Sequence, residues 1–234
     1  MTIDRKQAIA KDLLRMQAVF LRPEEPFIWA SGIKSPIYCD NRLTLSVPEV
    51  RTRIEDGLAD LVRTHFPDCA VLMGTSTAGI AHAAMVAERL ALPMGYVRGG
   101  AKDHGRKNQI EGRLMPGQKV VVVEDLLSTG GSVLEVVSIL RSAGAEVLGI
   151  VSIFTYQMEK SRRRLAEVKV VNYSLTDFDT VVSVAAEEAY IRPEDVTRLR
   201  RFRDHPADES WIQKATENGF DAENCEKEES EEEV

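Results

Sequence analysis

Short apolar runs alternate with helical patterns along the chain from Cys69 onward. The runs are rich in β-branched residues, as buried strands are, and they predict strands over residues 70–74, 94–98, 119–124, 146–154 and 169–174. Between them, apolar residues at helical spacing predict helices over 79–90 and 131–143, the second ending at Gly144. This alternation is typical of βαβ units, and it predicts an α/β fold with a mostly parallel central sheet flanked by helices.

Two regions do not follow the alternation. Residues 1–68 precede the first core strand and contain a helical pattern at about 5–20, followed by the Gly- and Pro-punctuated stretch FIWASGIKSPIYCDNR. The second region, GGAKDHGRKNQIEGRLMPGQ at 99–118, is a long polar connection with four basic residues and His104. Connections of this length in a compact domain are usually functional lids or disordered segments. The basic residues favour a lid over an anionic ligand.

Length and composition allow one large α/β domain, which we favour over two separate domains, because 234 residues with 44% hydrophobic residues can bury a full core. The three cysteines, Cys39, Cys69 and Cys225, show no metal-ligand spacing and suit a reducing cytoplasm. The charged N-terminus lacks the apolar core of a signal peptide, and no segment has the length of a membrane span. We therefore expect a soluble cytoplasmic protein with no membrane partner.

The acidity of the chain is concentrated at its end. Residues 217–234 hold nine acidic residues against Lys227, so that the rest of the chain carries a net charge of +1 although the whole carries −7. A nearly neutral body argues against a nucleic-acid partner. The tail is too poor in apolar groups to bury a core, and we expect a solvated, disordered segment rather than an interaction motif.

The most informative stretch is VVVVEDLLSTGGSV at 120–133. Between a strand and a helix, Ser128 to Ser132 form a turn with two glycines, where unpaired N–H groups and the helix dipole make an anion site. An ordinary helix N-cap beside a glycine turn explains these residues equally well. The carboxylates of Glu124 and Asp125 decide between the two, because ligands of open α/β sheets bind beyond the carboxyl ends of strands. An anion site beside acids predicts a ligand with a phosphate and neighbouring hydroxyl groups, and sugar phosphates fit.

The competing nucleotide motifs do not fit. The chain has no G-x-G-x-x-G after a strand. GRLMPGQ has the glycine spacing of a P-loop, but it precedes its strand and places Gln118 where the motif requires lysine. Both motifs are rejected.

The stretch VVVVEDLLSTGGS resembles the signature that binds phosphoribosyl pyrophosphate (PRPP) in type I phosphoribosyltransferases. YVRGGAKDHG at 96–105 resembles the mobile catalytic loop of the orotate phosphoribosyltransferases, and FIWASGIKSPIYCDNR resembles their N-terminal hood motif. MGTSTAGI at 73–80 stands in place of the family's pyrophosphate loop. Taken singly, Lys102 and His104 are explained as solvated loop charges, and Trp29 or Tyr38 as core aromatics. The four matches nevertheless occur in the expected order over roughly residues 10–190, and the chain is similar to orotate phosphoribosyltransferases.

The resemblance implies transfer of phosphoribose from PRPP to N1 of orotate, in pyrimidine biosynthesis. It implies Lys102 and Asp125 as catalytic residues, and Ser128, with hood residues near 31–34, as contacts of orotate. Mg²⁺ would be carried mainly by PRPP, without protein metal ligands. A homodimer would share its active sites, each lid serving the other chain. The PRPP-binding residues implied are Arg98, Lys102, His104, Glu124, Asp125, Leu126, Leu127, Ser128, Thr129, Gly130, Gly131 and Ser132.

The implied organisation has four segments. Residues 1–68 form a helix and a small hood over the base site, and residues 69–192 form the PRPP-binding α/β core with the type I phosphoribosyltransferase fold. Residues 193–216 form a C-terminal helical extension, and residues 217–234 the acidic tail.

Three positions depart from the family's pattern. Ala30 stands where many members have a lysine, Gly99 replaces a second loop cation beside Arg98, and SIFTY lacks an arginine that some members place near orotate. Lys34 is a candidate to compensate. These departures affect contacts with the substrates rather than the class of reaction.

Two other functions compete with this interpretation. One is a phosphoribosyltransferase that uses a purine base, against which the hood motif argues. The other is a PRPP-sensing regulator without catalytic activity, which would lack the lid cations Lys102 and His104 or carry a basic surface patch.

Overall fold

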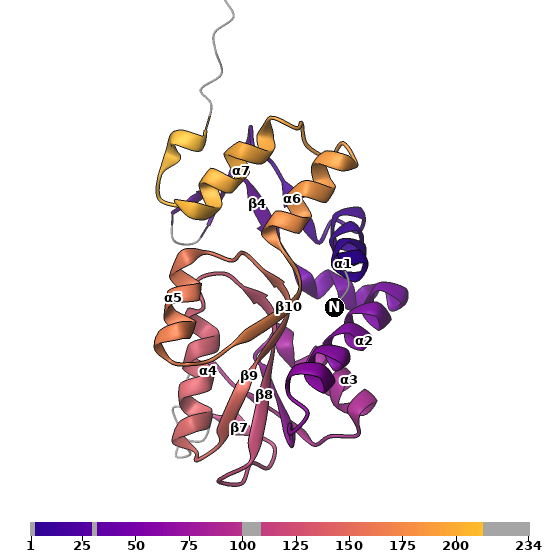
Figure 1. Ribbon diagram of the computed structural model, residues 1–234, viewed down its shortest axis with the longest axis vertical. Helices are drawn as coiled ribbons and strands as arrows, with labels where there is room; N and C mark the ends of the chain where they lie inside the picture. The colour runs from indigo at the N-terminus through magenta and orange to yellow at the C-terminus, as the bar shows by residue number, and fades with distance from the viewer. Residues whose placement is uncertain (1–2, 30–31, 100–108, 213–234) are drawn as a thin grey trace, which may run out of the picture.

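The computed structural model describes residues 3–29, 32–99 and 109–212. Its centre is a six-stranded sheet with the strand order β10-β9-β8-β5-β6-β7 (Figure 1). Neighbouring strands are parallel except β7, which pairs antiparallel with β6 at the edge. The strands are β5 (Val71–Thr75), β6 (Met94–Val97), β7 (Ile110–Glu111), β8 (Lys119–Leu127), β9 (Glu146–Thr155) and β10 (Asn172–Asp177). The prediction of a mostly parallel sheet is confirmed.

Helices cover both faces of this sheet (Figure 1). The helices α1 (Ile3–Arg15), α2 (Pro48–His65) and α3 (Ala78–Leu90) lie on one face, and α4 (Gly131–Ser142) and α5 (Glu159–Glu167) on the other. The valine run of β8 explains how one strand serves two cores: Val121 and Val123 join the cluster on the first face, whereas Val120 and Val122 join the cluster on the second. All four are fully buried, as a strand covered on both faces requires.

A cap lies at one end of the sheet and is built from both ends of the chain (Figure 1). Its N-terminal part has two antiparallel pairs, β1 (Val19–Leu21) with β4 (Ile37–Cys39) and β2 (Phe27–Ile28) with β3 (Lys34–Ser35), followed by the 3₁₀ turn η1 (Asn41–Ser46). Its C-terminal part consists of α6 (Phe178–Glu187), α7 (Asp195–Asp204) and η2 (Glu209–Trp211). We call residues 19–39 the hood and residues 193–212 the C-terminal extension.

Several predicted boundaries are wrong for identifiable reasons. The first helix ends at Arg15 rather than near 20, because Gln17 has a positive φ and the β-prone Val19 and Phe20 pair with the strand at 37–39. The last strand begins at Asn172 rather than 169, since Lys169 takes a left-handed conformation after α5. The connection at 99–118 is shorter than expected, because it contains β7.

Helix α2 was not predicted from the sequence. Its first residue is Pro48, and proline is common at the first position of a helix. Residues 1–2, 30–31, 100–108 and 213–234 lie outside the described residues, and the predicted acidic tail is among them. Within the described part of the chain, no helix is both long and apolar enough to cross a membrane.

Candidate active site

A polar crevice opens at the carboxyl ends of β5 and β8. The chain runs from β5 outward to β6 and then returns to the other side of β5 to form β8, β9 and β10, so the strand order reverses between β5 and β8. Such a switch point leaves a crevice in which ligands of open α/β sheets bind. Its cavity has a volume of about 340 Å³. The lining residues are Thr75, Ser76, Thr77, Ala78, Val97, Arg98, Gly99, Glu124, Asp125, Leu126, Ser128, Ser132, Glu135, Val136 and Ile139.

The two carboxylates belong to β8 itself, not to the turn after it. Pairing of β8 with β5 stops at Val123, whereas its pairing with β9 continues to Leu127. Glu124 and Asp125 therefore stand on a strand that outruns its neighbour, with the crevice where β5 has ended. The predicted strand end at Glu124 was three residues too early.

Close packing of α3 against β8 shapes the floor of the crevice. A Cβ atom at Gly79 would lie 2.4 Å from the carbonyl oxygen of Val123 and 2.5 Å from Oγ1 of Thr75. Glycine is therefore required at this position, because no side chain fits at those distances. The contact holds the turn after β5 directly beside the carboxylates.

Glu124 is buried, and its carboxyl group is held from two sides. Thr75 Oγ1 donates a hydrogen bond of 2.7 Å to Glu124 Oε1, and the backbone N–H of Asp125 donates to the same atom at 3.0 Å. Burial, followed by the hydrogen bond and the negative charge of the Asp125 side chain, raises the pKa of Glu124 to about 8, against the lowering effect of the hydrogen bonds from Thr75 and the Asp125 backbone. Glu124 is consequently protonated at neutral pH in the absence of a ligand.

Asp125 is half-buried and is tied to the residues that follow the hood. Asn41 Nδ2 donates to the backbone carbonyl of Asp125 at 2.7 Å, and the Cys39 thiol donates to Asn41 Oδ1 at 3.3 Å. Burial raises the pKa of the Cys39 thiol well above its ordinary value, with smaller contributions from the charges of Asp125 and Asp40. This thiol is therefore a hydrogen-bond donor rather than a thiolate nucleophile.

The predicted anion loop joins β8 to α4. The residue before α4 is Gly130, which has a φ of 78° and no side chain to cap the helix. Ser128 and Thr129 are therefore not the N-cap of α4, and no side chain of the described residues caps its first-turn N–H groups. The loop is fixed from behind by Arg164 of α5, whose Nη1 donates to the carbonyl oxygen of Thr129 at 3.3 Å. The sequence did not single out Arg164.

The base of the predicted lid lies at the same crevice. The backbone N–H of Arg98 donates to the carbonyl oxygen of Gln109 at 2.8 Å, and this bond continues the pairing of β6 with β7 at the base of the predicted lid. The Arg98 guanidinium lies 3.0 Å from the Glu111 carboxylate. The N–H of Gly99 donates to Ser76 Oγ at 2.7 Å, so the lid begins in contact with the turn after β5. Lys102 and His104, on which the lid hypothesis depends, lie outside the described residues.

The crevice is lined by half of the predicted PRPP-binding residues and by other residues that were not predicted. Of the predicted residues, Arg98, Glu124, Asp125, Leu126, Ser128 and Ser132 line the crevice. Leu127 is buried in the core, and Thr129 faces a second cavity beside the hood. Lys34 forms an ion pair of 2.8 Å with Glu209 of the C-terminal extension. Thr75 also lines the crevice, and the sequence did not single it out although it stands in the MGTSTAGI motif.

Comparison with known proteins agrees with this arrangement. The family model for the phosphoribosyl transferase domain matches residues 47–189. An orotate phosphoribosyltransferase of Bacillus cytotoxicus is 57% identical over 207 residues, which cover 88% of this chain and 99% of that protein. The orotate phosphoribosyltransferase of Bacillus subtilis is 56% identical over 209 residues, covering 89% of this chain and 97% of that protein.

A solved structure agrees as well. The crystal structure of orotate phosphoribosyltransferase from Aeropyrum pernix matches with a TM-score of 0.68 and 31% identity, covering 78% of this chain and 99% of that one. The fold, the crevice at the switch point and these relatives lead to one conclusion: the chain belongs to the orotate phosphoribosyltransferase family and has the type I phosphoribosyltransferase fold.

Proposed function

We propose that this chain transfers the phosphoribosyl group of PRPP to N1 of orotate, forming orotidine 5′-phosphate and pyrophosphate for pyrimidine biosynthesis. The observation that carries the proposal is the crevice at the switch point, in which two adjacent carboxylates lie beside an uncapped helix N-terminus. A ribose phosphate supplies matching hydroxyl groups and a matching anion. The names of the relatives support orotate as the acceptor.

The reaction replaces one bond at the anomeric carbon of PRPP. The bond from that carbon to the pyrophosphate oxygen breaks, and its electron pair leaves with pyrophosphate. N1 of orotate forms the new bond on the opposite face and releases its proton. Positive charge develops on the ribose as the old bond breaks, so the protein accelerates the reaction mainly by electrostatic stabilisation.

Each part of the crevice has a role in this reaction. Glu124 and Asp125 accept hydrogen bonds from the ribose 2- and 3-hydroxyls and lie near the developing cation. Backbone N–H groups and hydroxyls of residues 128–132 hold the 5-phosphate, and Ser128 also contacts orotate. Arg98, together with Lys102 and His104 of the lid, neutralises the departing pyrophosphate, and closure of the lid excludes water. The contact of Gly99 with Ser76 places the lid base beside the turn after β5.

Magnesium fits this site as an ion that the substrate carries. Among the described residues, no group of three or more His, Cys, Asp or Glu side chains is placed to hold a metal ion by itself. Two carboxylates beside an anion site suit a hard cation that keeps most of its ligands from phosphate oxygens and water. Magnesium supplies charge neutralisation of the pyrophosphate when bound.

The decisive experiment follows orotate absorbance after mixing the protein with PRPP and Mg²⁺. We expect the absorbance of orotate to fall, and to stay constant when EDTA is added. When uracil, adenine or hypoxanthine replaces orotate, we expect the absorbance of that base to stay constant. Asp125→Asn abolishes most of the turnover, whereas Asp68→Asn, on the surface beside Lys119, serves as the matched control. Consumption of a purine, or binding of PRPP without turnover of any base, would contradict the proposal in favour of one of the two competing functions.

The active sites are shared between two chains of a homodimer. A lid rich in charges and glycines gains little by folding over its own domain, and a two-fold interface gives it a second crevice to close. Lys102→Ala and Asp125→Asn are each nearly inactive as homodimers. A sample that exchanges subunits forms one intact site per heterodimer, and activity returns to about a quarter of wild type per chain. Heterodimers that are verified by mass spectrometry but inactive would refute sharing.

The reaction takes place in the cytoplasm. Cys39 and Cys69 are both free thiols in the structure, as a reducing compartment favours. Fractionation of the producing cells, followed by the orotate assay on each fraction, tests this placement.

A further inference from the structure

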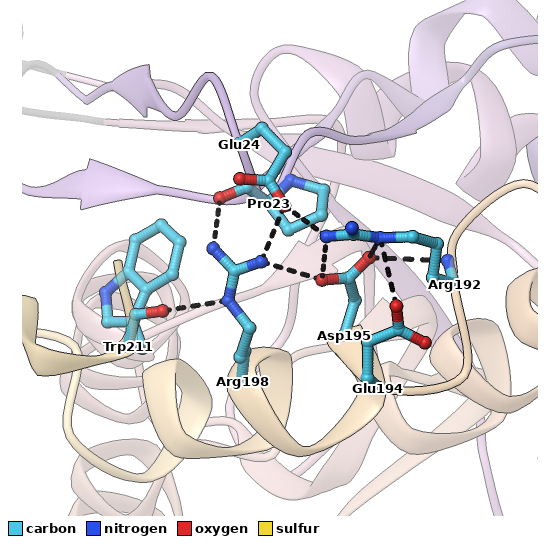
Figure 2. A network of polar contacts seen from close by, with 7 residues as sticks. All are labelled: Pro23, Glu24, Arg192, Glu194, Asp195, Arg198 and Trp211. Carbon is cyan, nitrogen blue, oxygen red and sulfur yellow. Dashed lines mark hydrogen bonds and ion pairs between the residues drawn. The ribbon is translucent and has the colours of Figure 1, made fainter. Parts of the chain in front are cut away.

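A buried arginine joins the C-terminal extension to the hood. Arg198 of α7 is 7% exposed, and its guanidinium donates to two other segments of the chain, residues 23–24 and Trp211. Nη2 donates to the carbonyl oxygen of Pro23 at 3.0 Å, Nη1 to the Glu24 carboxylate at 2.8 Å, and Nε to the carbonyl oxygen of Trp211 at 3.0 Å. Figure 2 shows the side chain of Arg198 pointing from its helix to the hood segment. The hood is thus held by specific polar contacts and not only by packing.

A second arginine and an aspartate complete this network. Nη1 of Arg198 also donates to Asp195 at 2.7 Å, and Asp195 is only 2% exposed. Arg192 bonds to the other oxygen of Asp195 at 3.2 Å and also pairs with Glu24 (Figure 2). Arginine suits this position because its planar fork can bond several carbonyl and carboxylate oxygens at once, which lysine cannot.

Aromatic packing ties the same two parts together. The ring of Trp29, at the end of the β2–β3 hairpin, lies 5.8 Å from that of Phe202 in α7 and 5.7 Å from that of Tyr156 after β9. Phe202 in turn packs edge-on against Trp211 at 5.6 Å. The C-terminal extension therefore forms the wall against which the hood hairpin rests.

This wall stands beside the anion loop. The N–H of Tyr156 donates to the carbonyl oxygen of Leu127, the last residue of β8. A cavity of about 730 Å³ is lined jointly by Ile33 of the hood, Thr129 of the loop and residues 203–208 at the end of α7. A displacement of the extension consequently changes the position of the hood over the loop.

We infer that Arg198 is a positioning residue for the acceptor base. It touches neither substrate, but it fixes the hood at the distance from the anion loop that orotate requires. This inference rests on the proposed function, because it takes the hood as the cover of the base site. It assigns the C-terminal extension a role in substrate affinity, whereas PRPP binds to residues of the core that the extension does not hold.

Steady-state kinetics distinguish positioning from a general structural role. Arg198→Met raises the KM for orotate by about tenfold or more and changes the KM for PRPP by less than about twofold. Arg198→Lys, which keeps the charge but not the fork, gives an intermediate KM for orotate. Arg200→Met is the matched control, since Arg200 lies on the same helix but pairs at the surface with Asp179.

A variant in the hood tests the same inference if Arg198→Met, in α7, does not fold. Glu24→Gln removes the charged partner of Arg198 and Arg192 from the hood side, where the Glu24 side chain is 55% exposed. We expect it to raise the KM for orotate in the same direction. An unchanged KM for orotate in Glu24→Gln and in any folded Arg198 variant would overturn the inference.

Fluorescence of Trp29 tests the position of the hood without any substrate. The chain has two tryptophans, and Trp211→Phe leaves Trp29 as the reporter. Trp211 Nε1 has no hydrogen-bond partner among the described residues, so this change removes no polar contact. In this background, Arg198→Met shifts the emission to the red and increases quenching by acrylamide, and Arg200→Met does neither.

The two proposals fail in different ways. A wild-type protein that does not consume orotate refutes the proposed function, while the emission of Trp29 still reports on the hood. A wild-type protein that consumes orotate, with variants whose emission is unchanged, refutes the positioning role alone.

Discussion

Replacing Glu124 with glutamine removes a titrating group from the crevice and keeps its hydrogen bonds. The amide oxygen of glutamine can accept from Thr75 Oγ1 and from the N–H of Asp125 as Glu124 Oε1 does. The amide NH₂ can donate to Asp125 in place of the protonated carboxyl group. Glu124→Gln is thus a close substitute for the protonated side chain at every pH.

The raised pKa of Glu124 determines how stability depends on pH. The pKa is about 8 in the folded protein, against the ordinary value of 4.5 in the unfolded chain. Between these pH values the unfolded chain releases a proton that the folded protein retains, so the free energy of unfolding falls as pH rises. Below pH 4.5 the free energy of unfolding is not lowered by Glu124. Above pH 8 it is lowered by the full amount, at most about 5 kcal/mol.

Urea denaturation of wild type and Glu124→Gln between pH 5 and pH 9 measures this effect. We expect the free energy of unfolding of the variant, relative to wild type, to rise by about 3–5 kcal/mol across this range. Glu135→Gln, on the exposed rim of the same crevice, controls for the loss of one carboxylate. Parallel pH profiles of wild type and Glu124→Gln would refute the burial and charge argument for Glu124.

Three further predictions follow from the same site. PRPP binding at pH 7 releases a proton from Glu124, so the calorimetric enthalpy depends on the ionisation enthalpy of the buffer in wild type and not in Glu124→Gln; equal dependence in both would contradict this. Lys102→Ala lowers kcat by more than about tenfold and changes the affinity for PRPP less, because its contacts tighten in the transition state; near-normal turnover would exclude the role. Deletion of residues 217–234 leaves the melting temperature and activity unchanged, and a large loss of either would show that the tail docks on the body.

The sheet was predictable because its strands carry strong local signals. Four consecutive valines indicate a strand covered on both faces, and the apolar runs elsewhere in the core gave four more strands within three residues of their observed starts. The strands of the hood have two or three residues each, too few to show a period. Their pairing depends on partners far along the chain rather than on their own composition.

The place of the two carboxylates beside the β8–α4 loop was predictable, but the contacts that hold them were not. The sequence placed Glu124 and Asp125 beside an anion loop, but the bond from Thr75 to Glu124 joins residues 49 apart. The network of Arg198 spans an even larger separation, 175 residues to Pro23. Local patterns contain no information about such contacts, which arise only once the strand order and the cap are in place.

The extra length of β8 gives two adjacent acids different environments. Side chains of a strand alternate between its faces, and β8 still alternates at Glu124 and Asp125 because β9 holds it as far as Leu127. Glu124 is thereby buried against Thr75, while Asp125 stays half-buried at the crevice. Had the strand ended at Glu124, as its apolar run indicated, a flexible turn would carry both acids and solvent would reach both. The pairing of β8 with β9 therefore keeps Glu124 buried, and this burial is the main cause of its raised pKa.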